Sequence, residues 1–155
     1  MTGIKIDGKI IAQTVKDRVK KATDELKTEG INPCLATVLI GSNAASATYV
    51  KNKHKACEEV GILTKDHKLD ESVTQQELNN IIDELNADVS VHGILVQLPL
   101  PKHLNEFATT SRISPIKDVD GLTPHNAGLL AMKKAVLVAC TPSGVMEIFD
   151  YHNID

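Results

Sequence analysis

Aromatic residues are scarce in this sequence, which has two Tyr, two Phe and no Trp among 155 residues. A hydrophobic core built from it must consist of Ile, Leu, Val and Ala side chains. No apolar run reaches the roughly 18 residues that cross a bilayer, so the sequence predicts no membrane partner. The opening residues, MTGIKIDGKI, lack the apolar segment of a signal peptide, and this favours a cytoplasmic protein.

An excess of positive charge and closely spaced cysteines are also missing. The net charge is −3 and the Lys and Arg residues are scattered, so neither the charge nor its distribution indicates a nucleic-acid partner. The three cysteines, Cys34, Cys57 and Cys140, form no Cys-x-x-Cys pair, and they indicate neither a zinc site nor a disulfide framework. Reduced thiols fit the cytoplasm as well. Asp118 and Asp120 have no third ligand nearby in the sequence, so we predict no metal site.

The pattern of apolar residues alternates between helical and strand character after a leading helix. Apolar groups recur every three to four residues in the helices, and Thr74 with Glu77 has the spacing of a capping box. The predicted helices cover 10–29, 45–59 and 74–86, and the predicted strands cover 34–40, 62–69 and 91–98. This order predicts an α/β fold of three layers with a mostly parallel sheet. Parallel sheets bind ligands at the carboxyl ends of their strands, which directs attention to the residues after Ile40 and Val96.

The remaining third of the chain has a less regular pattern. Prolines interrupt residues 99–124, which we expect to form loops and short helical turns. A helix is predicted over 126–136. Another helix is predicted to begin at CTPSG, with Thr141 or Ser143 as its N-cap.

Tyr49 and Lys53 are the first candidates for a functional site. They lie four residues apart on the predicted helix 45–59, so their side chains project from the same face. The tyrosine offers a flat ring and a hydroxyl, and a lysine amine shielded from water can exchange protons near neutral pH. The commoner explanation of this spacing is an exposed lysine stem lying on a tyrosine ring.

Two short motifs supply further polar candidates. In QLPLP, Gln97 lies in or beside an apolar strand, and a buried amide there must be hydrogen-bonded, whereas the alternative is an amide facing solvent. In KDVDG, Gly121 marks a tight turn, and one of the two aspartates can hold the turn while the other faces a pocket. A carboxylate suits a ligand with two adjacent N–H donors. An aspartate that only forms the turn is the commoner case.

The residues of these motifs and their order along the chain resemble those of the bifunctional methylenetetrahydrofolate dehydrogenase/methenyltetrahydrofolate cyclohydrolase family. GSNAASATYVKNKHKACEEVGI is similar to the first signature of that family, and GILVQLPLP and KDVDGLTPHNAG are similar to its second region. CTPSG is similar to the CTPxG that begins its cofactor domain. Ala139 replaces the usual proline before this motif, and Leu122 replaces the usual phenylalanine after KDVDG. The resemblance extends over essentially all 155 residues.

The resemblance implies two parts in the chain. Residues 1–138 would form the catalytic, folate-binding α/β domain, and residues 139–155 a connecting helix at the start of a truncated Rossmann-type NADP-binding domain whose remainder is absent. The implied reactions are NADP-dependent oxidation of 5,10-methylenetetrahydrofolate to the methenyl form and hydrolysis of that form to 10-formyltetrahydrofolate. Because the sequence has no Gly-x-Gly-x-x-Gly pattern, we expect this chain alone not to bind NADP tightly.

The resemblance also implies roles for individual residues. Asp120 would pair with the 2-amino-4-oxo edge of the pterin, and Tyr49 would stack on the aminobenzoyl ring. Lys53 would be the acid/base or electrostatic group at the one-carbon bridge, oriented by Gln97. The implied catalytic residues are Lys53, Tyr49, Gln97 and Asp120, and the implied substrate-binding residues are Tyr49, Gln97, Leu98, Pro99 and Asp120.

A homodimer acting on tetrahydrofolate derivatives in one-carbon metabolism, and so in purine and amino-acid biosynthesis, is the wider implication. Two alternatives remain at this point. The chain could be a non-catalytic folate-binding module or subunit that lacks its cofactor domain. It could also share the two-domain architecture of shikimate or amino-acid dehydrogenases and act on an unrelated small substrate, although KDVDG and QLPLP argue against this.

Overall fold

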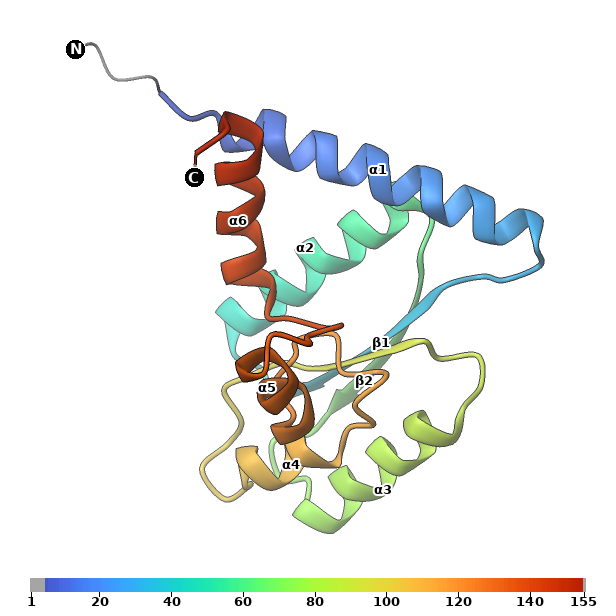
Figure 1. The fold of residues 1–155 in the computed structure, drawn as a ribbon. Helices are drawn as coiled ribbons and strands as arrows, with labels where there is room; N and C mark the ends of the chain where they lie inside the picture. The colour runs from blue at the N-terminus through green and yellow to red at the C-terminus, as the bar shows by residue number, and fades with distance from the viewer. Residues whose placement is uncertain (1–4, 155) are drawn as a thin grey trace.

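A computed structural model describes residues 5–154 and shows a three-stranded parallel sheet with helices on both faces (Figure 1). The helices are α1 (Gly8–Thr28), α2 (Ala44–Val60), α3 (Gln75–Ala87), α4 (Glu106–Arg112), α5 (Pro124–Ala131) and α6 (Cys140–His152), and the strands are β1 (Cys34–Ile40), β2 (Leu63–Leu69) and β3 (Gly93–Val96). The predicted α/β class and the predicted parallel sheet are confirmed.

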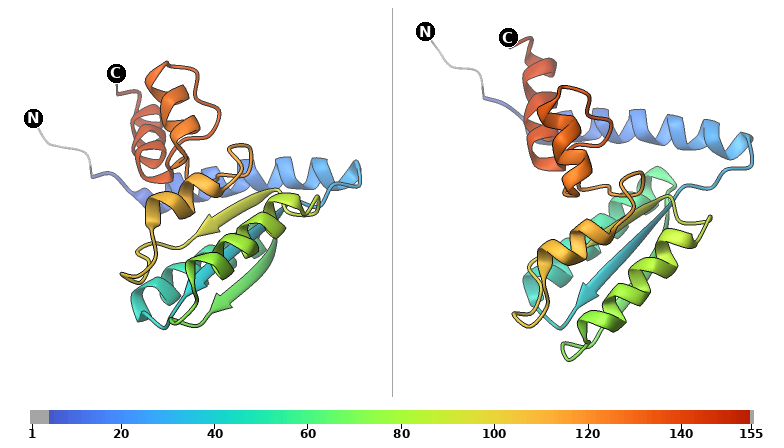
Figure 2. Two further views of the ribbon diagram at one scale, coloured as in Figure 1. Left: turned by 90° about the horizontal axis from the view of Figure 1, so that it is seen from below. Right: turned by 60° about the horizontal axis from the view of Figure 1, so that its bottom comes forward.

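The sheet has the strand order β2-β1-β3, so the first strand in the sequence lies in the middle. It pairs in parallel with β2 along its whole length and with β3 over residues 35–38. The chain reaches β2 through α2 and returns to β3 through α3. Figure 2 shows that α2 and α3 cover opposite faces of the sheet. Because both faces of β1 are covered, its sequence CLATVLI is an almost continuous apolar run.

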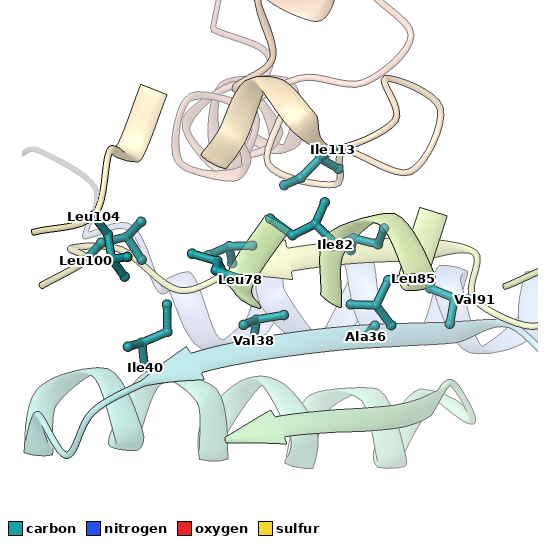
Figure 3. Packing of buried hydrophobic residues seen from close by; sticks show 12 residues of the cluster. Ala36, Val38, Ile40, Leu78, Ile82, Leu85, Val91, Leu100, Leu104 and Ile113 are labelled. Carbon is teal, nitrogen blue, oxygen red and sulfur yellow. The ribbon is translucent and has the colours of Figure 1, made fainter. Parts of the chain in front are cut away.

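The main core lies between the sheet and α3 (Figure 3). Alternate residues of β1 face α3, whose apolar residues recur at helical spacing. The buried residues from these two elements are Ala36, Val38, Ile40, Leu78, Ile82 and Leu85, each at most 6% exposed. This cluster is aliphatic, as the composition predicts.

Short sequence features determine where several helices and strands begin or end. Thr74 and Glu77 form the predicted capping box, in which the Glu77 carboxylate accepts from the Thr74 N–H at 2.8 Å. Gly61 ends α2 in the left-handed region at φ 78°. The strand predicted over 91–98 is shorter, from Gly93 to Val96. It cannot continue far past Gln97, because Pro99 has no N–H for a ladder hydrogen bond.

Two predictions about the last third of the chain are wrong in detail. The N-cap of α6 is Ala139, which makes no side-chain cap, and Thr141 and Ser143 lie inside the helix, where the Ser143 hydroxyl donates to the Ala139 carbonyl. The helix predicted over 126–136 runs instead from Pro124 to Ala131, because the Thr123 side chain caps it earlier than the apolar pattern indicates. Residues 99–124, predicted to form loops and short helical turns, contain the short helix α4.

Helix α1 packs against both α2 and α6, away from α3 (Figure 1). Ion pairs link α1 to both neighbours, through Lys16 with Glu59 of α2 and through Arg18 with Glu147 of α6. These pairs are exposed to solvent, so they contribute little to stability. None of the helices in residues 5–154 combines the length and apolar character that crossing a membrane requires.

Candidate functional site

A cavity of about 780 Å³, called the α2 cavity below, lies between α2, the sheet and the start of α6. Tyr49 and Lys53 line it from α2, Leu95 lines it from β3, and Asp120 lines it from the KDVDG turn. Most of the lining is apolar. Tyr49 is 64% exposed, so its ring lies at the mouth of the cavity, whereas Lys53 and Asp120 are half-buried. The structure therefore brings together three of the candidates that the sequence indicates.

Gln97 joins this group through Lys53. The Lys53 amine donates to the Gln97 side-chain carbonyl at 3.4 Å, and the Gln97 side-chain N–H donates to the Leu98 carbonyl at 2.7 Å. The second bond orients the amide, so that its oxygen faces the amine. Gln97 is half-buried and hydrogen-bonded, and the alternative of an amide that simply faces solvent is wrong.

Asp118 holds the KDVDG turn together. Its side chain is 1% exposed, and its Oδ2 accepts from the Thr123 N–H at 2.8 Å and from the Asn126 side-chain N–H at 2.9 Å. Its Oδ1 accepts from the Leu122 N–H at 3.2 Å. Burial acts to raise the pKa of Asp118, but the hydrogen bonds from Thr123, Asn126 and Leu122 outweigh it and hold the pKa below its usual value. A carboxylate with a lowered pKa and hydrogen bonds to both oxygens is suited to a structural role.

Asp120 has the opposite environment. Its carboxylate faces the α2 cavity and accepts no hydrogen bond from the part of the chain that the structure describes. Burial raises the pKa of Asp120; the positive charge of Lys53 acts against this rise, and the negative charge of Asp118 adds to it. Asp118 therefore stabilises the turn, whereas the Asp120 carboxylate is accessible to a ligand in the α2 cavity.

Two glycines allow the turn to pack closely against neighbouring segments. Asp118 forms a parallel bridge with Ile94, which places the turn beside β3. A Cβ on Gly93 would lie 2.5 Å from Cγ1 of Val119, so only glycine allows this close approach. Gly121 has φ +63°, and a Cβ there would lie 3.0 Å from the Val138 carbonyl carbon. These contacts fix Asp120 relative to both β3 and the start of α6.

Leu98 and Pro99 are not part of the α2 cavity. Leu98 packs against the aliphatic core on the α3 side of the sheet. Pro99 is exposed and lines a separate cavity of about 360 Å³, together with Gly41 and Asn43. The cis peptide bond between Leu98 and Pro99 turns the chain at this point. The structure therefore does not bring these two predicted contact residues to the Lys53 amine.

The position of the cavity differs in part from the prediction that ligands bind after Ile40 and Val96. Gln97 follows Val96 directly, as predicted, but the cavity also extends along the sheet to Cys34 and Gly93 at the amino ends of β1 and β3. The reason is that α2 runs back over the sheet, antiparallel to the strands, so that its successive turns line the whole face. The residues after Ile40 line the smaller cavity instead.

Sequence reasoning missed that all three cysteines line the same cavity. Cys34 comes from β1, Cys57 from α2 and Cys140 from the first turn of α6, so nothing in their spacing indicates that they share a site. Cys57 alone could have been anticipated, because it lies one helical turn after Lys53. Burial raises the pKa of the Cys34 and Cys57 thiols. Within residues 5–154, the structure places no three His, Cys, Asp or Glu side chains where they could hold a metal ion together.

The chemistry of the α2 cavity follows from these groups. Its apolar walls and the exposed Tyr49 ring suit a flat ligand that is mostly apolar. The Asp120 carboxylate suits two adjacent N–H donors at one end of such a ligand. The Lys53 amine, oriented by Gln97, then lies where it can exchange a proton with the bound molecule or stabilise a charge on it.

Comparison with known proteins identifies relatives of the chain. The sequence model described as "Tetrahydrofolate dehydrogenase/cyclohydrolase, catalytic domain" matches residues 6–120. The chain is 79% identical to "Bifunctional protein FolD" of Nitrosopumilus maritimus (strain SCM1), over 100% of this chain and 54% of that protein. The chain spans about half the length of the curated relatives that it matches.

Solved structures give the same result. The crystal structure of the bifunctional enzyme FolD, a methylenetetrahydrofolate dehydrogenase/cyclohydrolase from Campylobacter jejuni, has a TM-score of 0.94 and 47% identity, and the match covers 96% of this chain and 53% of that one. The FolD protein of Trypanosoma brucei, complexed with NADP cofactor and inhibitor, has a TM-score of 0.93 and 34% identity, over 99% of this chain and 53% of that one. In both, the shared part is about half of the longer protein.

Proposed function

The chain belongs to the tetrahydrofolate dehydrogenase/cyclohydrolase family, and on this premise we propose that it is the folate-binding half of a bifunctional enzyme. The enzyme would oxidise 5,10-methylenetetrahydrofolate to the methenyl form with NADP and hydrolyse the methenyl form to 10-formyltetrahydrofolate. The candidate residues Tyr49, Lys53, Gln97 and Asp120 all fall within the part of the chain that matches the family.

The observation that carries the proposal is the arrangement of Lys53, Gln97 and Asp120. The Lys53 amine contacts Gln97 at 3.4 Å, and Asp120, whose pKa is influenced by the charge of Lys53, faces the same cavity. The pterin ring of a folate carries a 2-amino group beside a ring N–H, which together match a carboxylate. With this edge on Asp120, the one-carbon bridge would lie toward Lys53 and the aminobenzoyl ring toward Tyr49.

Hydrolysis of the methenyl bridge requires proton transfers that this arrangement supports. Water attacks the bridge carbon, forms a C–O bond and loses one proton. The bond from that carbon to N5 then breaks, the hydroxyl proton passes to N5, which becomes an N–H, and the resulting formyl C=O stays on N10. Lys53 in its neutral amine form would accept the proton from the attacking water, and Gln97 would hold the amine in place. The net change is consumption of one water and release of one proton.

The oxidation step needs a hydride acceptor, which NADP would supply. The chain has no Gly-x-Gly-x-x-Gly segment, so none of its residues is assigned to NADP. The contribution of this chain to that step is to bind and orient the folate.

Family membership also supports a wider set of proposals. Residues 1–138 would be the folate-binding domain and residues 139–155 the connection to an NADP-binding domain. The protein would act in the cytoplasm as a homodimer and supply one-carbon units for purine and amino-acid biosynthesis.

A non-catalytic folate-binding module is the second candidate function. It is favoured by one observation, namely that Tyr49 and Asp120 line the α2 cavity and would suffice to hold a folate without any proton transfer. Both candidates require folate binding in the α2 cavity, but only the first requires turnover.

Hydrolysis of 5,10-methenyltetrahydrofolate, followed by absorbance, separates the two candidates. We expect the chain to hydrolyse it, and Lys53→Met to reduce the rate on the order of 10²–10⁴-fold, because a positioned proton-transfer group contributes that much. Lys53→Arg should not restore activity, since arginine keeps its proton near neutral pH. Lys51→Met, at an exposed position on α2, is the matched control and should hydrolyse at the wild-type rate.

Two results would contradict the proposal. A wild-type chain that binds folic acid but hydrolyses nothing would contradict turnover by this chain and favour the binding module. A folded Lys53→Met variant with the wild-type rate would show that Lys53 is only a surface lysine.

A further inference from the structure

His54 follows Lys53 directly on α2 and contacts a different part of the sheet. Its Nε2 lies 3.0 Å from the Thr37 hydroxyl of β1 and 2.7 Å from Oδ1 of Asp66 on β2. The Thr37 hydroxyl also donates to the same Asp66 oxygen at 2.8 Å. His54, Thr37 and Asp66, called the His54 cluster below, thus connect α2 to β1 and β2, whereas Gln97 follows β3.

The hydrogen atoms of the cluster can be assigned from chemistry. The Thr37 hydroxyl has one proton, which it donates to Asp66, and an ionised carboxylate can only accept. Both neighbours of His54 Nε2 are therefore acceptors, so Nε2 must carry a proton. This holds for the neutral ring and for the charged ring, so the contact persists in both states.

The middle of α2 depends on such contacts because it lacks buried side chains. In this fully described helix the buried residues are Ser46, Val50 and Val60, so the interval 51–59 contains none. Lys53 lies within that interval. Two consecutive polar residues hold it to the sheet, Lys53 through Gln97 and His54 through the cluster.

These two contacts lie on opposite sides of the line along which α2 rests on the sheet. Consecutive residues point about 100° apart around a helix. The strand order β2-β1-β3 accordingly places the Lys53 contact on the β3 side of the sheet, at the residue that follows this strand, and the His54 contact over β1 and β2. Rotation of α2 about its axis in either direction would lengthen one of the two contacts. The contact between His54 and the sheet is well anchored, because Thr37 lies on the central strand and is 1% exposed.

We propose that His54 is a positioning residue, which fixes the rotation of α2 through Thr37 and Asp66 and thereby holds the Lys53 amine beside Gln97. His54 does not line the α2 cavity, so it acts through Lys53 and not on a ligand. Its effect on catalysis rests on the proposed function. Its effect on the contact between Lys53 and Gln97 does not.

The test compares His54→Leu, which keeps the bulk and loses the N–H donor, with His54→Gln, which keeps a side-chain N–H donor. Asp66→Ala removes the acceptor from the exposed strand β2 without changing α2, and Lys51→Leu is the control on the exposed side of α2. The first readout is the NMR resonance of the Gln97 side-chain amide, with Lys53→Met as the reference for a lost contact. The second is kcat and KM for hydrolysis of 5,10-methenyltetrahydrofolate.

We expect the Gln97 resonance of His54→Leu and Asp66→Ala to move toward its position in Lys53→Met, and that of His54→Gln and Lys51→Leu to remain at the wild-type position. We also expect His54→Leu to lower kcat by about tenfold with KM within about twofold, because a small displacement of a reacting group impairs the chemical step more than binding. His54→Gln should retain most of kcat.

An unchanged Gln97 resonance in His54→Leu would overturn the proposal, and so would equal behaviour of the Leu and Gln variants. If the chain shows no hydrolysis at all, the proposed function fails, and the Gln97 resonance still decides whether His54 positions Lys53.

Discussion

Asp118 and Asp120 lie two residues apart in one turn, yet their pKa values shift in opposite directions. Asp118 accepts hydrogen bonds from Leu122, Thr123 and Asn126, and its pKa is lowered despite its burial. Asp120 is half-buried beside an open cavity, and burial raises its pKa. One carboxylate is therefore committed to the fold, while the other is available to a ligand, and the two can be tested separately.

Asp120→Asn should weaken the binding of folic acid, which carries the 2-amino-4-oxo edge. We expect a loss of roughly 1.5–3 kcal/mol, as for a hydrogen bond to a charged group. Titration calorimetry measures this directly, with Glu58→Gln on the exposed side of α2 as the control for loss of one negative charge. Equal affinity of wild type and Asp120→Asn would remove Asp120 from the site.

Acid should weaken folic acid binding through the same carboxylate. Because the pKa of Asp120 is raised above the ordinary value of 3.8, its charge is lost at a higher pH than that of a typical aspartate. Affinity should therefore begin to fall above pH 3.8 as the pH is lowered, and the fall should be smaller in Asp120→Asn. The difference between the two pH profiles isolates Asp120 from protonation of the ligand itself. Parallel profiles would contradict the prediction.

Asp118→Asn should lower the free energy of unfolding by about 1–3 kcal/mol, because an amide offers one acceptor oxygen in place of two and leaves a buried N–H without a partner. Since the folded-state pKa of Asp118 lies below its unfolded value, its contribution is present above the unfolded pKa and is lost as the pH falls through the folded pKa. Urea unfolding of wild type and variant over a series of pH values measures both effects. A variant as stable as wild type at neutral pH would show that the turn does not depend on the carboxylate.

Gly93→Ala should destabilise the fold, because its Cβ would lie 2.5 Å from Cγ1 of Val119. We expect about 1–3 kcal/mol, as for overpacking elsewhere, together with weaker folic acid binding, since Val119 adjoins Asp120. Gly144→Ala is the matched control, because nothing lies within 4 Å of a Cβ at this position in α6, and it should stabilise the helix by about 0.5–1 kcal/mol. Denaturant unfolding of both variants tests the contrast, and a loss of stability in both would point to a general intolerance of glycine substitution.

NADP should bind only weakly to this chain, because its sequence has no glycine-rich segment of the kind that holds a dinucleotide phosphate. Fluorescence or calorimetric titration with NADP should show no tight saturation, whereas folic acid should bind measurably to the same sample. Tight, saturable NADP binding would mean that the cofactor site lies within these residues.

Features that depend on neighbours in the sequence could be predicted from it. The bounds of β1, the capping box of Thr74 and Glu77, and the end of α2 at Gly61 follow from local apolar periodicity and from the hydrogen-bonding needs of helix ends. The shared face of Tyr49 and Lys53 follows from helical geometry for the same reason. The family could be recognised because motifs with several letters each occur in order along the chain.

Features that depend on packing between distant segments were decided only by the tertiary structure. The opposite roles of Asp118 and Asp120 depend on the N–H donors that the start of α5 brings to the turn. The position of Leu98 on the core side of the sheet depends on the direction in which the chain leaves β3. The convergence of Cys34, Cys57 and Cys140, and of His54 with Thr37 and Asp66, requires the strand order β2-β1-β3 and the path of α2 across it. Such contacts join residues far apart in sequence, so their identity is set by how helices and strands pack and not by any local pattern of residues.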